Sequence, residues 1–184
     1  MIFLNSNDTK KSIQLMTELD KKVFGAELLY NFTPEVTARH AHPMSIYASA
    51  LSDDRKEMLA YISTTIVCER YYQKLLRGEA KEEQFEPWDE KDTPLLFVRN
   101  LVVKDRRATP YIFRSLLKEI QQLFVDYELY VHRAFTIASH WATRRALTAY
   151  GFKEVGTYQG KYPILLANRD ESPVLNSLLK KYEE

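Results

Sequence analysis

The residues best suited to chemistry lie in a basic turn that follows an apolar run. Arg106 and Arg107 come after the run at residues 95–103, and Thr109-Pro110 follows them, a hydroxyl and a proline in the order typical of a helix start. Amide groups at a helix start attract anions, and arginine binds phosphate through paired hydrogen bonds. The turn therefore suits a phosphate-bearing ligand, although the same arrangement is also a common way to build an α/β protein.

Other residues able to do chemistry are spread along the chain. Glu69 follows a predicted strand, where its carboxylate could act as a base or could simply favour the start of the next helix. His140 precedes a predicted helix and titrates near neutrality, so it is another candidate base, with a structural role as the alternative. His40 and His42 have the spacing of two metal ligands, but no third ligand lies nearby in the sequence, and we expect no metal.

The hydrophobic pattern predicts the elements that must position these residues. The run at 95–103 has the length of a strand, and apolar residues from Ile112 to Phe124 recur at helical spacing. The same reasoning predicts strands at 2–5, 45–51, 57–67, 128–138, 153–158 and 161–167, and helices at about 7–23, 33–40, 71–77, 141–149 and from 172. Residues 79–93 are polar and acidic, and we expect them to form an exposed insertion.

Composition limits the class of protein. A chain of 184 residues with 45% hydrophobic residues is long enough for one domain with a sizeable core. The formal net charge of +1 gives no reason to expect nucleic acid or an acidic membrane as a partner. Cys68 is the only cysteine, which excludes an internal disulfide. No run has transmembrane length and the first residues do not form a signal peptide, so we expect a cytoplasmic protein.

The order of the predicted elements resembles the GCN5-related N-acetyltransferase family over roughly residues 8–167. The stretch LLFVRNLVVKDRRATPYIFRSLL resembles the family's strand ending in valine, here Val103, followed by a phosphate-binding loop and a helix with a Leu-Leu pair, here Leu116-Leu117. The stretch TRRALTAYGFKEVG, residues 143–156, resembles the family's helix that leads to a Gly-Phe pair and a final strand.

This resemblance implies a fold and a domain organisation. The fold is α/β, with a central mixed, mainly antiparallel sheet flanked by helices. Residues 1–170 would form one domain, and residues 171–184 would form a C-terminal helix that packs on this domain or on a partner.

The resemblance also implies a cofactor, acetyl-CoA or another acyl-CoA. In the family the strand edge pairs with the pantetheine arm and the turn holds the pyrophosphate, which implies cofactor contacts from Leu101, Val102, Val103, Arg106, Arg107, Ala108, Thr109, Tyr111 and Ile112. The loop is a degenerate form of the family pattern, because no glycine occurs between Gly78 and Gly151. Bulky side chains at the family's glycine positions restrict the approach of a pyrophosphate to the backbone.

The implied activity is transfer of an acyl group to the amine of a small molecule or a protein. The family's tyrosine proton donor aligns with Leu147, and Tyr150, one helical turn further on, is the candidate donor in its place. Glu69 and His140 are the candidate bases. The glycine-free loop leaves a second hypothesis, a non-catalytic regulatory or partner-binding protein with the same fold. A third is an interaction protein that forms a homodimer through the helix at 172–184.

Overall fold

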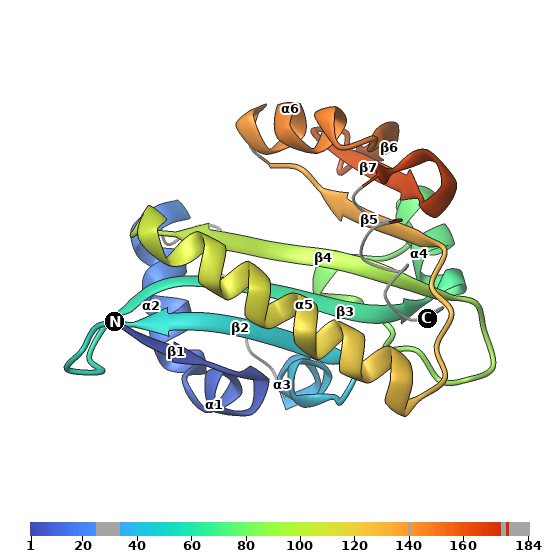
Figure 1. The fold of residues 1–184 in the computed structure, drawn as a ribbon. Coiled ribbons are helices and arrows are strands. Elements are labelled where there is room, and N and C mark those ends of the chain that lie inside the picture. Colours follow the sequence, from blue (N-terminus) through green and yellow to red (C-terminus); the bar gives the residue numbers. More distant parts are fainter. Residues whose placement is uncertain (25–33, 140, 174–175, 177–184) are drawn as a thin grey trace. The chain divides into compact units, whose positions relative to one another are not determined.

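The computed structural model describes residues 1–24, 34–139, 141–173 and 176 (Figure 1). The chain divides into two compact units, which are described separately below. The first comprises Met1–Thr64 with Asn100–Gln122, and the second comprises Thr65–Arg99 with Leu123–Glu184.

The described strands form one mixed, mainly antiparallel sheet in the order β1-β2-β3-β4-β5-β7-β6, flanked by helices. Its strands are β1 (Ile2–Leu4), β2 (Ser45–Leu51), β3 (Met58–Cys68), β4 (Pro94–Val103), β5 (Arg133–Ile137), β6 (Lys153–Tyr158) and β7 (Tyr162–Asn168). The described α-helices are α1 (Ser6–Lys11), α2 (Ile13–Phe24), α3 (Pro34–Ala41), α4 (Glu69–Leu76), α5 (Thr109–Asp126) and α6 (Trp141–Ala149). This architecture confirms the predicted fold class.

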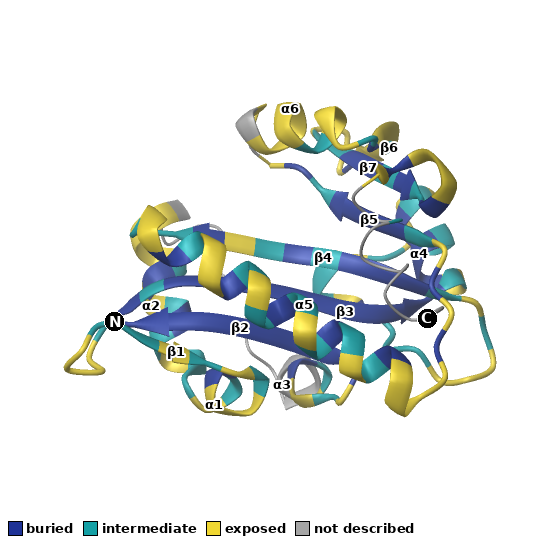
Figure 2. Cartoon of the chain, viewed as in Figure 1, coloured by how far each residue is buried: buried dark blue, intermediate teal, exposed yellow. Residues whose placement is uncertain are grey.

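The first unit buries its core between α2 and the strands. Apolar residues recur along α2 at helical spacing, so that Met16 and Leu19 lie on the same face and pack against Tyr47, Tyr61 and Val102 of the sheet. Every residue of β2 is buried, as Figure 2 shows, and α5 crosses in front of these strands in Figure 1. The core of this unit therefore holds the C-terminal part of β4 in place.

The second unit has its own aromatic core. Strand β4 pairs with β5 in parallel, with Leu96 opposite Ala134 and Val98 opposite Thr136. This register sets Phe97 opposite Phe135, and their rings stack with centroids 4.5 Å apart. Tyr72 of α4 adds a tilted ring contact to Phe135. Aromatic pairs in such arrangements stabilise a core beyond the area that they bury.

Three predicted elements differ from the structure. The helix predicted at 7–23 is two helices, because Ser12 ends α1 with its hydroxyl donating to the Asp8 carbonyl, 3.2 Å away. The strand predicted at 128–138 shortens to β5. The insertion predicted at 79–93 is not wholly exposed, since Phe85 is 1% exposed and Val67 and Pro87 form an isolated bridge.

Some predictions lie on residues that the structure does not describe. Most of the helix expected from residue 172 is among them, so packing of residues 171–184 on the domain or on a partner remains a prediction. The single domain expected at 1–170 is likewise untested. Among the described helices, none is both long enough and apolar enough to cross a membrane.

Candidate functional site

The basic turn directly follows the end of β4, a largely buried strand. Val102 is buried in the core of the first unit, whereas Leu101 is 42% exposed. The backbone amides of Lys104 and Asp105 both donate to the carbonyl of Leu59, at 2.8 and 3.0 Å. The start of the turn is thereby fixed to β3, and Leu101 remains accessible on the strand before it.

The sequence predicts Thr109 as the N-cap at the start of this helical stretch. In the structure the N-cap is Asp105. A short 3₁₀ helix, Arg106–Ala108, precedes α5, and Asp105 is its N-cap. The carboxylate of Asp105 accepts from the amide of Arg107 at 3.0 Å and from its Nη2 at 2.6 Å. Thr109 has helical dihedral angles, φ −53° and ψ −51°, which an N-cap residue does not adopt. The helical stretch therefore begins earlier than the Thr-Pro pair indicates.

The amides of Ala108 and Thr109 already have partners within the turn. The amide of Ala108 donates to the Asp105 carbonyl at 3.1 Å, and that of Thr109 donates to the Arg106 carbonyl. Pro110 has no amide to offer. The contacts from Arg107 lower the pKa of Asp105 to about 2. The Asp105 carboxylate thus occupies the helix start as an internal anion, in the kind of position where an external phosphate would bind.

Only part of the positive charge in the turn is available to a ligand. Lys104 pairs with Glu57 at 2.6 Å, and Lys22 of α2 reaches the same carboxylate at 2.9 Å. These two lysines lower the pKa of Glu57 to about 2. Arg107 is held by Asp105, whereas Arg106 is exposed and forms no ion pair within the described part of the chain. Arg106 is therefore the cation that a phosphate would meet first.

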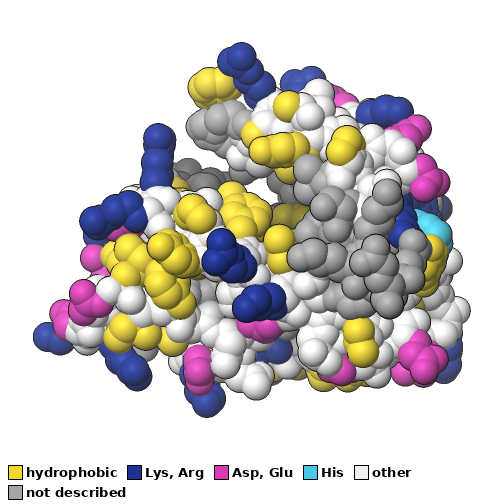
Figure 3. Space-filling view, viewed as in Figure 1, with side chains coloured by type: hydrophobic (Ala, Val, Ile, Leu, Met, Phe, Trp, Pro, Cys, Tyr) yellow, Lys and Arg dark blue, Asp and Glu magenta, His cyan; other side chains and the backbone are white. Residues whose placement is uncertain are grey.

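The remaining predicted cofactor residues divide into buried and exposed groups. The side chains of Val102, Ala108 and Ile112 are buried, so only their backbone could contact a ligand. Val103 and Thr109 are half-buried. Tyr111 is 56% exposed and stacks on Phe3 of β1, with ring centroids 4.8 Å apart. Figure 3 shows hydrophobic side chains gathered on the surface near the beginning of α5.

A series of hydrogen bonds between side chains of the first unit was not predicted from the sequence. The Tyr61 hydroxyl donates to Oδ1 of Asp20 at 2.7 Å and accepts from Nδ2 of Asn100 at 3.4 Å. Tyr61 is 1% exposed, and Asp20 is half-buried. Burial raises the pKa of Asp20 to about 6, and the hydrogen bond from Tyr61 opposes this rise. No local motif marks Asp20, because only the packing of α2 on the sheet buries it.

The predicted catalytic residues of the second unit are not gathered around one another. Glu69 is the first residue of α4, and its carboxylate accepts from Nε2 of Gln73 at 2.7 Å and pairs with Arg133. Tyr150 follows α6 with its side chain 53% exposed, while its carbonyl accepts from the Ser172 hydroxyl at 2.8 Å. His140 lies outside the described residues. The engaged carboxylate of Glu69 fits a structural role, and the catalytic roles of all three residues remain predictions.

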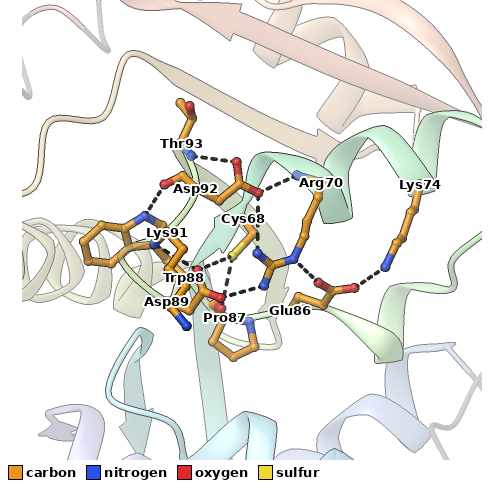
Figure 4. A network of polar contacts seen from close by, with 10 residues as sticks. All are labelled: Cys68, Arg70, Lys74, Glu86, Pro87, Trp88, Asp89, Lys91, Asp92 and Thr93. Atoms are coloured by element: carbon orange, nitrogen blue, oxygen red, sulfur yellow. Dashed lines mark hydrogen bonds and ion pairs between the residues drawn. The ribbon is translucent and has the colours of Figure 1, made fainter.

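Cys68 belongs to a polar network that holds the insertion against the start of α4 (Figure 4). Arg70 donates to Glu86 at 2.7 Å and to Asp89 at 2.8 Å, and its amide donates to Asp92 at 2.9 Å. The Cys68 thiol lies 3.6 Å from the Asp89 carboxylate, and burial raises the pKa of this thiol to about 11. A thiol that stays protonated at neutral pH is a poor nucleophile, so this network is structural.

The two histidines with metal-ligand spacing have other contacts. Nδ1 of His40 lies 2.6 Å from the Tyr47 hydroxyl, and Nδ1 of His42 accepts from the Met44 amide at 3.2 Å. Among the described residues, no group of three or more His, Cys, Asp or Glu side chains is arranged to hold a metal ion.

Comparison with known proteins identifies the fold. No protein-family model matches the sequence, and no curated protein matches it. Solved structures do match. Arabidopsis thaliana NAA60 in complex with acetyl-CoA has a TM-score of 0.52 at 11% identity, over 90% of this chain and 95% of that one. Aminoglycoside 6'-acetyltransferase type Ii has a TM-score of 0.51 at 14% identity, over 91% and 97%.

The chain has the fold of the GCN5-related N-acetyltransferases.

Proposed function

We propose that this protein is an acyl-CoA-dependent N-acyltransferase that uses acetyl-CoA or a related thioester. The observation that carries the proposal is the β4–turn–α5 unit, in which an exposed Leu101 edge leads into a turn with an accessible Arg106. Similar structures include NAA60 in complex with acetyl-CoA and in complex with a bisubstrate analogue. The acceptor would be an amine on a small molecule or a protein.

The residues present fit this co-substrate in two respects. The β4 edge at Leu101–Val103 offers backbone groups beside an exposed apolar side chain, which suits the amide-bearing pantetheine arm. Arg106 suits the diphosphate, because guanidinium groups form paired hydrogen bonds with phosphate oxygens. Holding the amine and the thioester together would supply much of the rate enhancement, since positioning alone can contribute several kcal/mol.

One observation favours a second candidate, a non-catalytic regulatory or partner-binding protein of the same fold. The Asp105 carboxylate already satisfies the helix start, and its negative charge opposes a diphosphate in that position. A chain that no longer binds acyl-CoA would tolerate such a carboxylate without loss. The two candidates therefore differ first in whether acyl-CoA binds.

A thermal-shift titration with acetyl-CoA and with free CoA tests the proposal. Ligand at about 100 times its dissociation constant should stabilise the folded protein by about 2.7 kcal/mol, which is visible as a higher melting temperature. The Arg106→Ala/Arg107→Ala variant should lose this shift. The matched control is Arg144→Ala/Arg145→Ala, an adjacent exposed pair on α6, which should keep it.

Each outcome decides between the candidates. A saturable shift that disappears only in the 106/107 variant supports the acyltransferase, and transfer of labelled acetyl to an amine then establishes the reaction. No shift with either ligand in the unmodified protein overturns the proposal and favours the non-catalytic candidate.

A further inference from the structure

Asp20 and Glu119 are half-buried acidic residues of the first unit that form no ion pair within the described part of the chain. Both oxygens of Glu119 accept hydrogen bonds from Ser6, whereas one oxygen of Asp20 accepts from Tyr61. Glu57 is held by two lysines, and Asp105 is held by Arg107. The carboxylate of Asp20 is half-buried on α2, and within the described part of the chain it forms no ion pair. A half-buried carboxylate without a cation is costly, and such a group is a candidate for binding one from outside.

The position of Asp20 connects it to β4. Its Oδ1 accepts from the Tyr61 hydroxyl at 2.7 Å, and this hydroxyl accepts from Nδ2 of Asn100 at 3.4 Å. Asn100 directly precedes Leu101–Val103, the edge proposed for the pantetheine arm. Two hydrogen bonds thus separate the carboxylate from the strand that would carry the thioester. The buried Tyr61 fixes the orientation of one Asp20 oxygen, and no hydrogen bond reaches the second oxygen from the described part of the chain.

We infer that Asp20 receives the acceptor of the proposed reaction, a primary amine, pairing with its cationic form and taking the proton that the nitrogen releases during acyl transfer. This inference rests on the proposed function. It places the base on α2, in place of the sequence candidates Glu69 and His140. Tyr61 and Asn100 are then positioning residues.

The cationic amine first gives one proton to the Asp20 carboxylate, which releases it to solvent and is ionised again. The lone pair of the neutral amine attacks the thioester carbonyl carbon, a C–N bond forms, and the C–S bond breaks with its electron pair leaving on sulfur as the CoA thiolate. The nitrogen loses one proton, which passes to the Asp20 carboxylate. That proton later leaves to solvent or to the thiolate, and the carboxylate is restored.

The electrostatic surroundings of Asp20 fit this role. Burial raises its pKa to about 6, closer to neutrality than an ordinary aspartate, so the group is largely ionised at pH 7.5 and still a useful proton acceptor. From the sheet it meets the neutral side chain of Tyr61, which in turn contacts the neutral Asn100. On its own helix, Glu18 and Lys21 are exposed, and Lys22 is engaged by Glu57.

The test compares Asp20→Asn with Glu18→Gln, an exposed acid on the same helix. Asparagine keeps an oxygen that can accept from Tyr61, so the fold should survive. The assay measures release of the CoA thiol from acetyl-CoA in the presence of a peptide with a free amino terminus, spermidine or an aminoglycoside. It also detects hydrolysis of acetyl-CoA, in which water is the nucleophile. Asp20→Asn should lower turnover by roughly 100-fold or more, as loss of a general base typically does, and should abolish the acid limb near pH 6. Acetyl-CoA affinity should stay unchanged, and Glu18→Gln should resemble the unmodified protein.

Tyr61→Phe is a second variant, for which the inference predicts the direction of the change in the pH profile. Removing the hydroxyl takes away a hydrogen bond that favours the ionised carboxylate, so the acid limb should move to higher pH while turnover falls less than in Asp20→Asn. Wild-type turnover and an unchanged pH profile in Asp20→Asn would overturn the inference and leave the proposed function intact. If the unmodified protein does not bind acetyl-CoA, the proposed function fails, and the assignment of Asp20 fails with it.

Discussion

The carboxylate of Asp105 accepts both the backbone amide and the guanidinium of Arg107, two residues further along the chain. One acidic side chain thus occupies the helix start and neutralises one of the two arginines in the turn. The turn that looks strongly basic in the sequence is close to neutral in the structure, and Arg106 is the residue that retains available charge.

Asp105→Asn should bind CoA more tightly than the unmodified protein. Asparagine is also a good N-cap, so the helix start is kept while the negative charge is removed and Arg107 is released. We expect roughly a tenfold gain in affinity, equivalent to about 1.4 kcal/mol, measured by isothermal titration calorimetry. Asp8→Asn, the same change at an exposed position of α1, should have no effect. Unchanged or weaker binding in Asp105→Asn would show that the carboxylate does not compete with the ligand.

Asp20 should make the folded protein less stable as the pH rises. Its pKa is about 6 in the folded state against 3.8 as the ordinary value, so the folded state binds the proton more tightly. Stability from this group is complete below about pH 4 and is lost as the pH rises through 6. Between pH 4.5 and 7.5, the free energy of unfolding of Asp20→Asn should therefore rise by about 1–2 kcal/mol relative to that of the unmodified protein, as measured by urea unfolding. Glu18→Gln is the control. A constant difference between the proteins at the two pH values would contradict a raised pKa.

Cys68 should react slowly with thiol reagents in the folded protein. Its side chain is buried and its pKa is raised to about 11, which leaves little thiolate at pH 8. We expect labelling with iodoacetamide to be about 100-fold slower than in the same protein unfolded in urea, because the thiolate fraction falls tenfold per unit of pKa. Arg70→Ala should speed the labelling by releasing the insertion from α4. Equal rates in native and unfolded protein would show that the network does not protect the thiol.

Gly151 should be far less tolerant of substitution than Gly160. Both have positive φ, +89° and +65°, which favours glycine. A Cβ at Gly151 would lie 2.8 Å from the Glu171 carbonyl oxygen, whereas one at Gly160 meets nothing within 4 Å. Gly160→Ala should cost about 1 kcal/mol of unfolding free energy, and Gly151→Ala about 3 kcal/mol or more. Chemical denaturation measures both, and equal losses would mean that the backbone near Glu171 moves aside.

Local patterns in the sequence were enough for most of the secondary structure. The apolar run at 95–103 became β4, and the helical spacing after Pro110 became α5, because hydrophobic periodicity reports directly on which face of an element is buried. The family resemblance gave the fold class on the same grounds. Boundaries were less secure where a polar side chain bonds to nearby backbone, as Ser12 does between α1 and α2.

The candidate site depended on contacts that residue order does not show. The sequence determined that a basic, glycine-free turn joins a strand to a helix. Only the tertiary structure decided that Asp105 neutralises Arg107 there, and that Asp20 is buried beside Tyr61, 41 residues away in the chain. The physical reason is that charge depends on solvation and on neighbours in space, whereas hydrophobic periodicity is already present in the order of the residues.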